Sequence, residues 1–272
     1  MSATSSAVVR AVRPVGRPLF NLAFVLASLV GLWLLVLHLA DVSPLVTRKP
    51  QDVYEFLFVD RKAPANRTAV LSPLWQTLLD AGIGFVAGLG AAIAIATATY
   101  LSRGVEAATM PVAMLVRTVP LVALAPIITL LLGNGLATVA VMSGIVVLFP
   151  ALVTIAFGLR SVTPQMSDVV HVYGGGTWAV LRRVAYPSAV PSVFAAIRIS
   201  VPGAITGALI AEFYTTPDSV GKAINQGLAL YQYDLVWSLL VVLTLASVLL
   251  YAVAQLLEGL VLARFGLAAQ RS

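Results

Sequence analysis

Long apolar stretches separated by short polar ones form the main pattern along this chain of 272 residues. A helix that crosses a bilayer needs roughly 20 mostly apolar residues. Backbone polar groups in lipid must be satisfied internally, which such a stretch achieves as a helix. The pattern therefore predicts an all-α membrane protein with six transmembrane helices. The six stretches are 20–40, 74–101, 112–132, 136–159, 192–211 and 235–263.

The polar stretches divide the chain into five regions. We expect a cytoplasmic N-terminal tail (1–19), a first transmembrane helix (20–40), an extracytoplasmic loop (41–71), a core with the other five helices (72–264) and a cytoplasmic C-terminal tail (265–272). In this orientation nine basic residues lie inside and six outside, and that excess favours cytoplasmic termini.

The connections within the core follow from its polar residues. Gly133-Asn134-Gly135 predicts a tight turn, and 102–106 a short one. We expect 215–234 to be an extracytoplasmic loop and 160–190 to be the largest cytoplasmic loop.

Composition agrees with a membrane protein. The chain is 60% hydrophobic and 10% charged, whereas soluble domains carry about 25% charged residues. The absence of cysteine excludes thiolate zinc sites and thiol catalysis. The net charge of +6 could suit nucleic acid, but basic residues of membrane proteins mark cytoplasmic loops, so no nucleic-acid partner is expected. His38 and His171 are isolated, and we expect no metal site.

The loop 160–190 is polar and rich in glycine, unlike its surroundings. Thr163-Pro164 is typical of a helix start, and Gly174 can end that helix in the left-handed conformation. Thr177 can cap a second short helix, which Pro187 is expected to stop because the residue before a proline avoids helical angles. The sequence predicts a helix, a glycine turn and a second helix.

Two other interpretations of this loop were considered. A phosphate-binding loop would need a lysine after the glycines and a strand before them, and neither is present. An amphipathic helix resting on the lipid surface, with Trp178 as its anchor, stays open.

Small and charged residues interrupt the apolar stretches. Gly82, Gly84, Gly88 and Gly90 suit close contact between helices. A charge facing lipid costs a few kcal/mol, so charged side chains here are expected to face protein or water. Four such residues are Asp80, Arg117, Arg198 and Glu212.

The roles of these charges stay open at this stage. Asp80 either lines a pathway or makes a hydrogen bond between helices. Arg117 and Arg198 either serve a gate or reach the cytoplasmic surface with their long side chains. Pro120, like Pro126 and Pro202, can kink a helix beside a cavity.

Seven residues of the polar loop follow a fixed spacing, and they are Asp168, Val169, Val170, Gly174, Val184, Tyr186 and Pro187. This spacing resembles the cytoplasmic EAA loop of ABC importer permeases, written E-A-A-x3-G-x9-I-x-L-P. Every interval agrees, and Gly174 and Pro187 are identical to the pattern. Val169, Val170 and Tyr186 depart from it. Residues 116–135 and 195–224 are similar to the third and fifth spans of the nitrate/sulfonate/taurine-type branch.

The resemblance implies a type I permease fold, with a cytoplasmic coupling helix between the fourth and fifth spans. The expected partners are ABC ATPase subunits, a second permease copy (identical or not), an extracytoplasmic solute-binding protein and membrane lipid. ATP and Mg would be bound by the ATPase, and no cofactor by this chain. The location implied is a bacterial-type cytoplasmic membrane.

Roles for individual residues also follow from the resemblance. The expected ATPase-coupling residues are Asp168, Gly174, Arg182, Arg183, Val184 and Pro187. The expected pathway or gate residues are Arg117, Pro120, Arg198 and Glu212, and Asp80 is a further candidate, particular to this chain, because it is a charge within a span. No catalytic residue is expected.

Three other functions compete with the importer. An ion-coupled secondary transporter would need carboxylates near the membrane midplane, but the carboxylates here lie towards one face. A membrane-embedded enzyme would need paired catalytic groups, and no such motif is visible. For a non-transporting scaffold the loop spacing would be coincidence. The resemblance to ABC importer permeases implies a small, often anionic, organic or inorganic solute as cargo.

Overall fold

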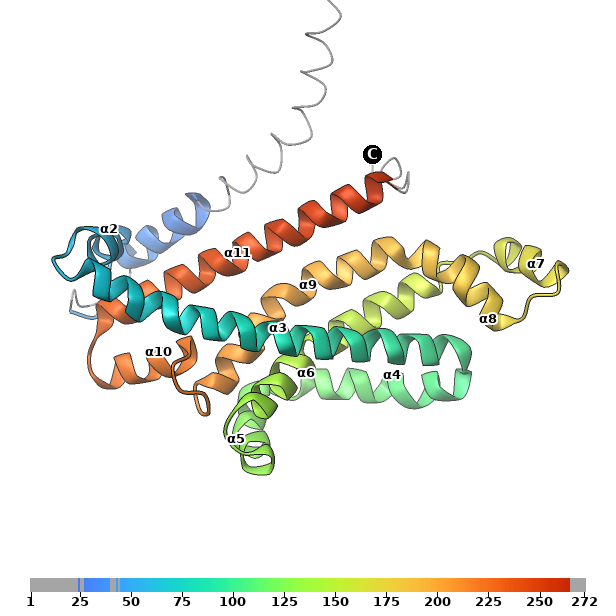
Figure 1. Ribbon diagram of the computed structural model, residues 1–272, viewed down its shortest axis with the longest axis horizontal. Coiled ribbons are helices and arrows are strands. Elements are labelled where there is room, and N and C mark those ends of the chain that lie inside the picture. Colours follow the sequence, from blue (N-terminus) through green and yellow to red (C-terminus); the bar gives the residue numbers. More distant parts are fainter. Residues whose placement is uncertain (1–23, 25–26, 40–42, 44, 265–272) are drawn as a thin grey trace, which may run out of the picture. The chain divides into compact units, whose positions relative to one another are not determined.

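The computed structural model describes residues 24, 27–39, 43 and 45–264. The tails expected at 1–19 and 265–272 lie outside these residues. The chain divides into two units, Met1–Asn66 and Arg67–Ser272, which are described separately. Every regular element in the described part is a helix (Figure 1).

The first unit contains short helices. An apolar helix covers Ala27–Leu39, within the span expected at 20–40, and residues 20–23, 25–26 and 40 of that span lie outside the described part. The helix α2 (Pro50–Tyr54) and the π-helix η1 (Glu55–Val59) occupy part of the stretch 41–71 that was expected to be a loop. The carboxylate of Asp52 accepts a hydrogen bond from the Lys49 N–H at 2.7 Å and so caps α2.

Among the residues that the structure describes, four helices are long and apolar enough to cross a membrane. They are α3 (Ala63–Leu101), α6 (Leu136–Leu159), the continuous helix Thr177–Glu212 that contains α9 (Tyr186–Glu212), and α11 (Tyr233–Arg264). The helix α3 starts at Ala63 rather than at residue 74, since Pro64 is tolerated in a first turn where no N–H partner exists. The sequence predicts six spans; the described residues contain four, or five if one bent pair counts as a span, and the first expected span (20–40) lies partly outside them.

A bent pair of helices covers the span expected at 112–132, in which Pro120 and Pro126 can kink a helix. The helices α4 (Arg103–Thr118) and α5 (Leu121–Leu132) meet at a bend of 106°. Pro120 is the physical reason, because it disfavours helical angles at Val119, whose φ and ψ are −75° and 126°. The turn expected at 102–106 is limited to Ser102, whose Oγ accepts a hydrogen bond from the Val105 N–H.

Local residues decide two connections, one before α6 and one after α9. The glycine turn at 133–135 is present as predicted, with φ of 77° at Gly133 and 129° at Gly135. The stretch 215–234 was expected to be a loop, but it contains the helix α10 (Val220–Ala229). Ser219 starts this helix, since its Oγ accepts from the Lys222 N–H at 3.4 Å.

Close helix contacts within the second unit depend on two of the four glycines of α3. A Cβ on Gly88 would lie 2.5 Å from the Gly144 carbonyl oxygen of α6, and one on Gly84 would meet Ser143. Gly82 and Gly90 have nothing within 4 Å of that position. The prediction of close contact is therefore confirmed for Gly84 and Gly88 and wrong for Gly82 and Gly90 within this chain.

Candidate functional site

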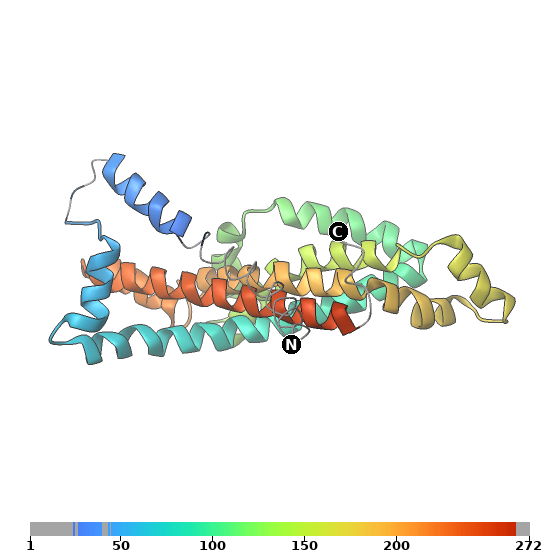
Figure 2. The same cartoon turned by 90° about the horizontal axis from the view of Figure 1, so that it is seen from above.

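The polar loop folds as two helices joined by a glycine turn. The helix α7 (Pro164–Val172) is followed by the turn, then α8 (Thr177–Val180) and the π-helix η2 (Leu181–Ala185). Within the second unit, α7 and α8 lie at one end of α6, α9 and α11, and α10 lies at the other end (Figure 1, Figure 2).

Gly174 ends α7 in the left-handed conformation, as the sequence predicted, with φ of 78°. Its N–H donates to the His171 carbonyl at 2.9 Å, and the Gly175 N–H donates to the Val170 carbonyl at 2.9 Å. This pair of bonds is the Schellman arrangement. His171, which seemed isolated in the sequence, also fixes the turn, because its Nδ1 lies 2.8 Å from the Gly175 carbonyl oxygen.

The second helix does not stop at Tyr186-Pro187, contrary to the prediction. It continues from Thr177 to Glu212, because one π turn precedes the proline. In this turn the Tyr186 N–H donates to the Leu181 carbonyl five residues earlier. The wider turn accommodates a residue that has no N–H and a bulky ring. The loop is therefore a rigid extension of α9.

The outer surface of the two-helix loop combines apolar, aromatic and basic side chains. Val172 is 84% exposed and Tyr173 86% exposed, and Trp178 is exposed on the second helix. Arg182 and Arg183 are exposed beside it. Asp168, Gly174 and Pro187 are also exposed, and Val184 is half-buried. Aromatic residues and arginine gathered on an exposed surface are typical of protein interfaces.

The base of the loop is fixed to the spans. Leu181 and Ala185 are buried in the same apolar cluster as Ala96 of α3. Thr97 donates its hydroxyl proton to the Ile93 carbonyl, so in its contact with the Tyr186 hydroxyl it acts as acceptor. Tyr186, one of the departures from the EAA pattern, thus bonds the loop to α3.

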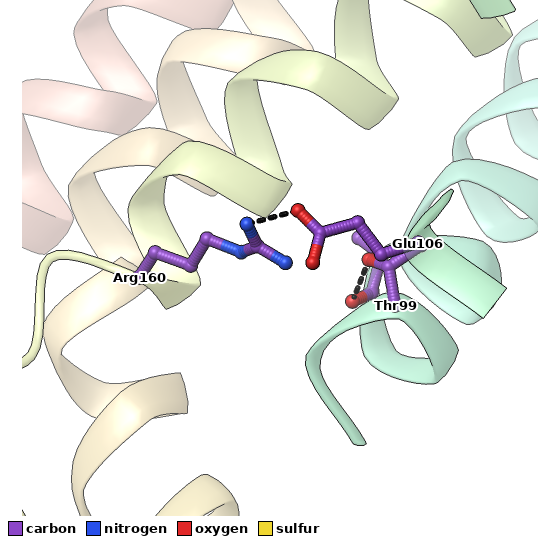
Figure 3. Close-up of polar contacts among 4 residues, drawn as sticks. Thr99, Glu106 and Arg160 are labelled. Atoms are coloured by element: carbon purple, nitrogen blue, oxygen red, sulfur yellow. Dashed lines mark hydrogen bonds and ion pairs between the residues drawn. The ribbon is translucent and has the colours of Figure 1, made fainter. Parts of the chain in front are cut away.

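Beside this base, Arg160 at the end of α6 forms an ion pair with Glu106 near the start of α4 (Figure 3). The hydrogen bond to Glu106 is the main cause that raises the pKa of the Arg160 guanidinium. The two side chains are partly exposed, so water screens the pair and it contributes little to stability. The sequence analysis assigned neither residue to a site.

At the other end, Asp80 of α3 and Glu212 of α9 are both buried. The Thr77 hydroxyl donates to Glu212 Oε2 at 2.7 Å, and the Gly221 N–H donates to the same oxygen at 3.3 Å. Gln76 Nε2 donates to Asp80 Oδ1 at 3.0 Å. The structure therefore brings together two carboxyl groups that are far apart in sequence.

Arg198 of α9 lies apart from both ends. Its guanidinium Nη1 is 3.1 Å from Oε2 of Glu258 on α11, and its Cζ lies 6.0 Å from the Tyr251 ring centroid. Glu258 was not among the residues expected at a site, although it is a carboxylate within the apolar stretch 235–263, as Asp80 is within 74–101. The five residues expected to form a pathway do not form one cluster.

The remaining candidates are Pro120 and Arg117 at the bend between α4 and α5, and any site for a metal ion. Pro120 begins α5 at the bend, while the Arg117 side chain lies outside the described side chains. Among the residues that the structure describes, no group of three or more His, Cys, Asp or Glu could hold a metal ion.

Comparison with known proteins identifies a family. Residues 84–266, more than half of the chain, match the model of the family described as binding-protein-dependent transport system inner membrane component. A relative from Chloroflexus aurantiacus, the riboflavin transport system permease protein RibX, is 32% identical over 58% of this chain and 59% of that protein. The match thus spans less than two thirds of that relative.

Two further relatives match over most of their length. A probable ABC transporter permease protein from Haemophilus influenzae is 27% identical over 84% of this chain and 90% of that protein. A putative aliphatic sulfonates transport permease protein, SsuC, from Bacillus subtilis is 23% identical over 85% of this chain and 83% of that protein. The expected resemblance to permeases of this branch is confirmed.

Proposed function

The chain belongs to the family of binding-protein-dependent transport system inner membrane components, and we propose that its loop 160–190 is the element through which an ATPase subunit drives it. The chain is a permease subunit of an ABC importer for a small solute. It is a transport subunit, not an enzyme, and it is a multi-pass protein of the inner membrane.

The observation that carries this proposal is the surface of the two-helix loop. A permease must receive force from a separate ATPase, so a docking element must protrude, be rigid and connect to the spans. The loop protrudes with Val172, Tyr173 and Trp178 exposed, its turn is fixed by hydrogen bonds, and its second helix is continuous with α9. Rigid-body rocking of helices could then follow movement of the loop.

We assign roles within the loop by where each side chain lies. Gly174 sets the angle between α7 and α8. Arg182 and Arg183 add positive charge to the docking surface, and Asp168 adds a carboxylate on α7. Val184 and Pro187 belong to the junction that connects the loop to α9. Chemically, the partner surface would be a cleft that is apolar and partly acidic.

The assembly proposed is larger than this chain. ATP and Mg would bind to the ATPase subunits, with no cofactor on the permease. A solute-binding protein would deliver cargo from outside, and a second permease copy would complete the pathway. Six spans are proposed, with 20–40 as the first and the bent pair α4–α5 as the third, and both termini in the cytoplasm.

The cargo proposed is a small organic or inorganic solute, because the relatives are named for riboflavin and for aliphatic sulfonates. We place the gate at the bend with Arg117 and Pro120. Asp80, Glu212 and Arg198 are engaged with other groups of the same chain, which supports a role in holding helices together.

Cysteine labelling tests the proposed orientation. The chain has no cysteine, so the unsubstituted protein gives no background. A cysteine at Ser161, which is exposed beside α7, should react with an impermeant maleimide only from the cytoplasmic side. The matched position Gln226, exposed on α10, should react only from outside. Labelling of position 161 from the outer side alone would contradict the orientation and with it the docking of an ATPase.

A further inference from the structure

Two buried carboxyl groups near the α9–α10 connection do not receive a hydrogen bond at each of their oxygens. Asp80 is 2% exposed and Glu212 is 0% exposed. Gln76 donates to one oxygen of Asp80, and Thr77 and Gly221 donate to one oxygen of Glu212. The other two oxygens, Oδ2 and Oε1, are buried and accept no hydrogen bond from the described residues. Such orphan acceptors are costly and call for an explanation.

The two carboxyl groups are close enough to hydrogen-bond to each other. Two ionised carboxylates cannot do so, because neither has a proton to donate. Two like charges that share a dry site also repel, and the usual resolution is that one of them holds a proton. A single proton between Asp80 and Glu212 would supply the donor that the site lacks.

No positive side chain provides another way to neutralise the pair. In the part of the chain that the structure describes, Asp80 and Glu212 form no ion pair, and the only charged group that acts on each is the other. The helix α6, which packs against α9, contains no charged residue. The titratable residues of the neighbouring elements at this end, none of which interacts with the pair, are Tyr214, Asp218, Lys222, Tyr233 and Asp234.

We propose that Asp80 and Glu212 form a proton-binding site that fastens α3 to the connection between α9 and α10. The protonated pair joins α3 to α9. Thr77 extends the link to α10, because its Oγ1 accepts from the Val220 N–H at 3.0 Å while its hydroxyl donates to Glu212 at 2.7 Å. The site therefore holds three helices together at one point.

The direction of the pH dependence follows from the bound proton. The folded state holds a proton that two separate carboxylic acids in water would release. The shared proton therefore stabilises the folded state at lower pH. As the pH rises and the proton leaves, two facing anions remain and repel. Stability should therefore fall with rising pH.

Thermal unfolding of the purified complex with its ATPase subunits, in a pH series, tests the site. The Tm of the unsubstituted complex should fall by about 2–4 °C or more as the pH rises above neutral. Asp80→Asn should remove this dependence, because the amide N–H replaces the shared proton at every pH. Thr77→Val should lower Tm at all pH values and keep the slope. Glu106→Gln, at the opposite end of the spans, should keep the native slope.

Several outcomes would overturn the proposal. One is an Asp80→Asn complex with the same pH slope as the unsubstituted protein, and another is an Asp80→Asn complex that is strongly destabilised even at low pH. Infrared spectroscopy of the unsubstituted complex gives a measurement that needs no variant. It should show the carbonyl band of a protonated buried carboxyl that disappears as the pH rises, and its absence would also overturn the proposal.

Discussion

Gly174→Val is expected to lower solute uptake and binding-protein-stimulated ATP hydrolysis by on the order of tenfold or more, without preventing membrane insertion. Gly174 has φ of 78°, and nothing lies within 4 Å of a Cβ added there, so the strain would come from the backbone and not from crowding. A residue with a side chain pays about 1–2 kcal/mol in this conformation, and a β-branched residue more. Since 1.4 kcal/mol is a factor of ten, the ratio of molecules with the turn to molecules without it would fall by about tenfold or more.

Gly176→Val is the matched control for this change. Gly176 lies two residues further along, has φ of −86°, and also has nothing within 4 Å of an added Cβ. Valine adopts this backbone conformation easily, so near-normal coupling is expected. Both variants should be reconstituted in vesicles with the ATPase and the binding protein. Equal coupling in the two variants would mean that the angle between α7 and α8 does not matter for transport.

Gly88→Leu is expected to reduce the yield of assembled permease by about fivefold or more. A Cβ there would lie 2.5 Å from the Gly144 carbonyl oxygen and 2.9 Å from the Val147 Cβ, so α3 and α6 would have to separate. Overpacking of this kind typically costs about 1–3 kcal/mol, and 1–2 kcal/mol is a factor of about 5–30 in the ratio of folded to unfolded molecules.

Gly90→Leu provides the control on the same helix. No atom lies within 4 Å of a Cβ at Gly90, so the leucine should be accommodated. Size-exclusion chromatography and thermal unfolding of both variants would show the difference. If Gly90→Leu is as damaging as Gly88→Leu, the contact between α3 and α6 is not the cause.

Hydrophobic runs with sharp ends were predictable from the sequence. The helix α6 begins at Leu136 and ends at Leu159, as the sequence predicted, because the run is uncharged and lies between a glycine turn and Arg160. The left-handed Gly174 was also predictable, since glycine tolerates that conformation at a helix end. These features depend only on residues close together in the chain.

Prolines were harder to interpret, because a proline can end, bend or merely begin a helix. Pro120 separates α4 from α5 by a bend of 106°, within a stretch where the sequence indicated that prolines can kink a helix. Pro187 was expected to stop a helix, yet the π turn η2 allows the helix to continue. The choice depends on whether the preceding turn can widen, which in turn depends on packing around Leu181 and Ala185.

The candidate pathway residues could not be grouped from the sequence. Glu212 and Asp80 lie on different helices, and only the fold brings their carboxyl groups together. The hydrogen-bonded partner Thr77 gave no signal, because threonine is common in membrane helices. Glu258, by contrast, was visible as a charge inside an apolar run.

The most direct test of the coupling proposal is photo-crosslinking from Tyr173. A photo-reactive phenylalanine derivative there replaces an aromatic side chain that is 86% exposed at the tip of the loop. The same derivative at Tyr231, which is 76% exposed after α10, is the matched control at the opposite end of the spans. Illumination of the intact transporter should attach the ATPase subunit to position 173 and not to position 231. An ATPase adduct at position 231 with none at position 173 would contradict the proposal that this loop receives the ATPase.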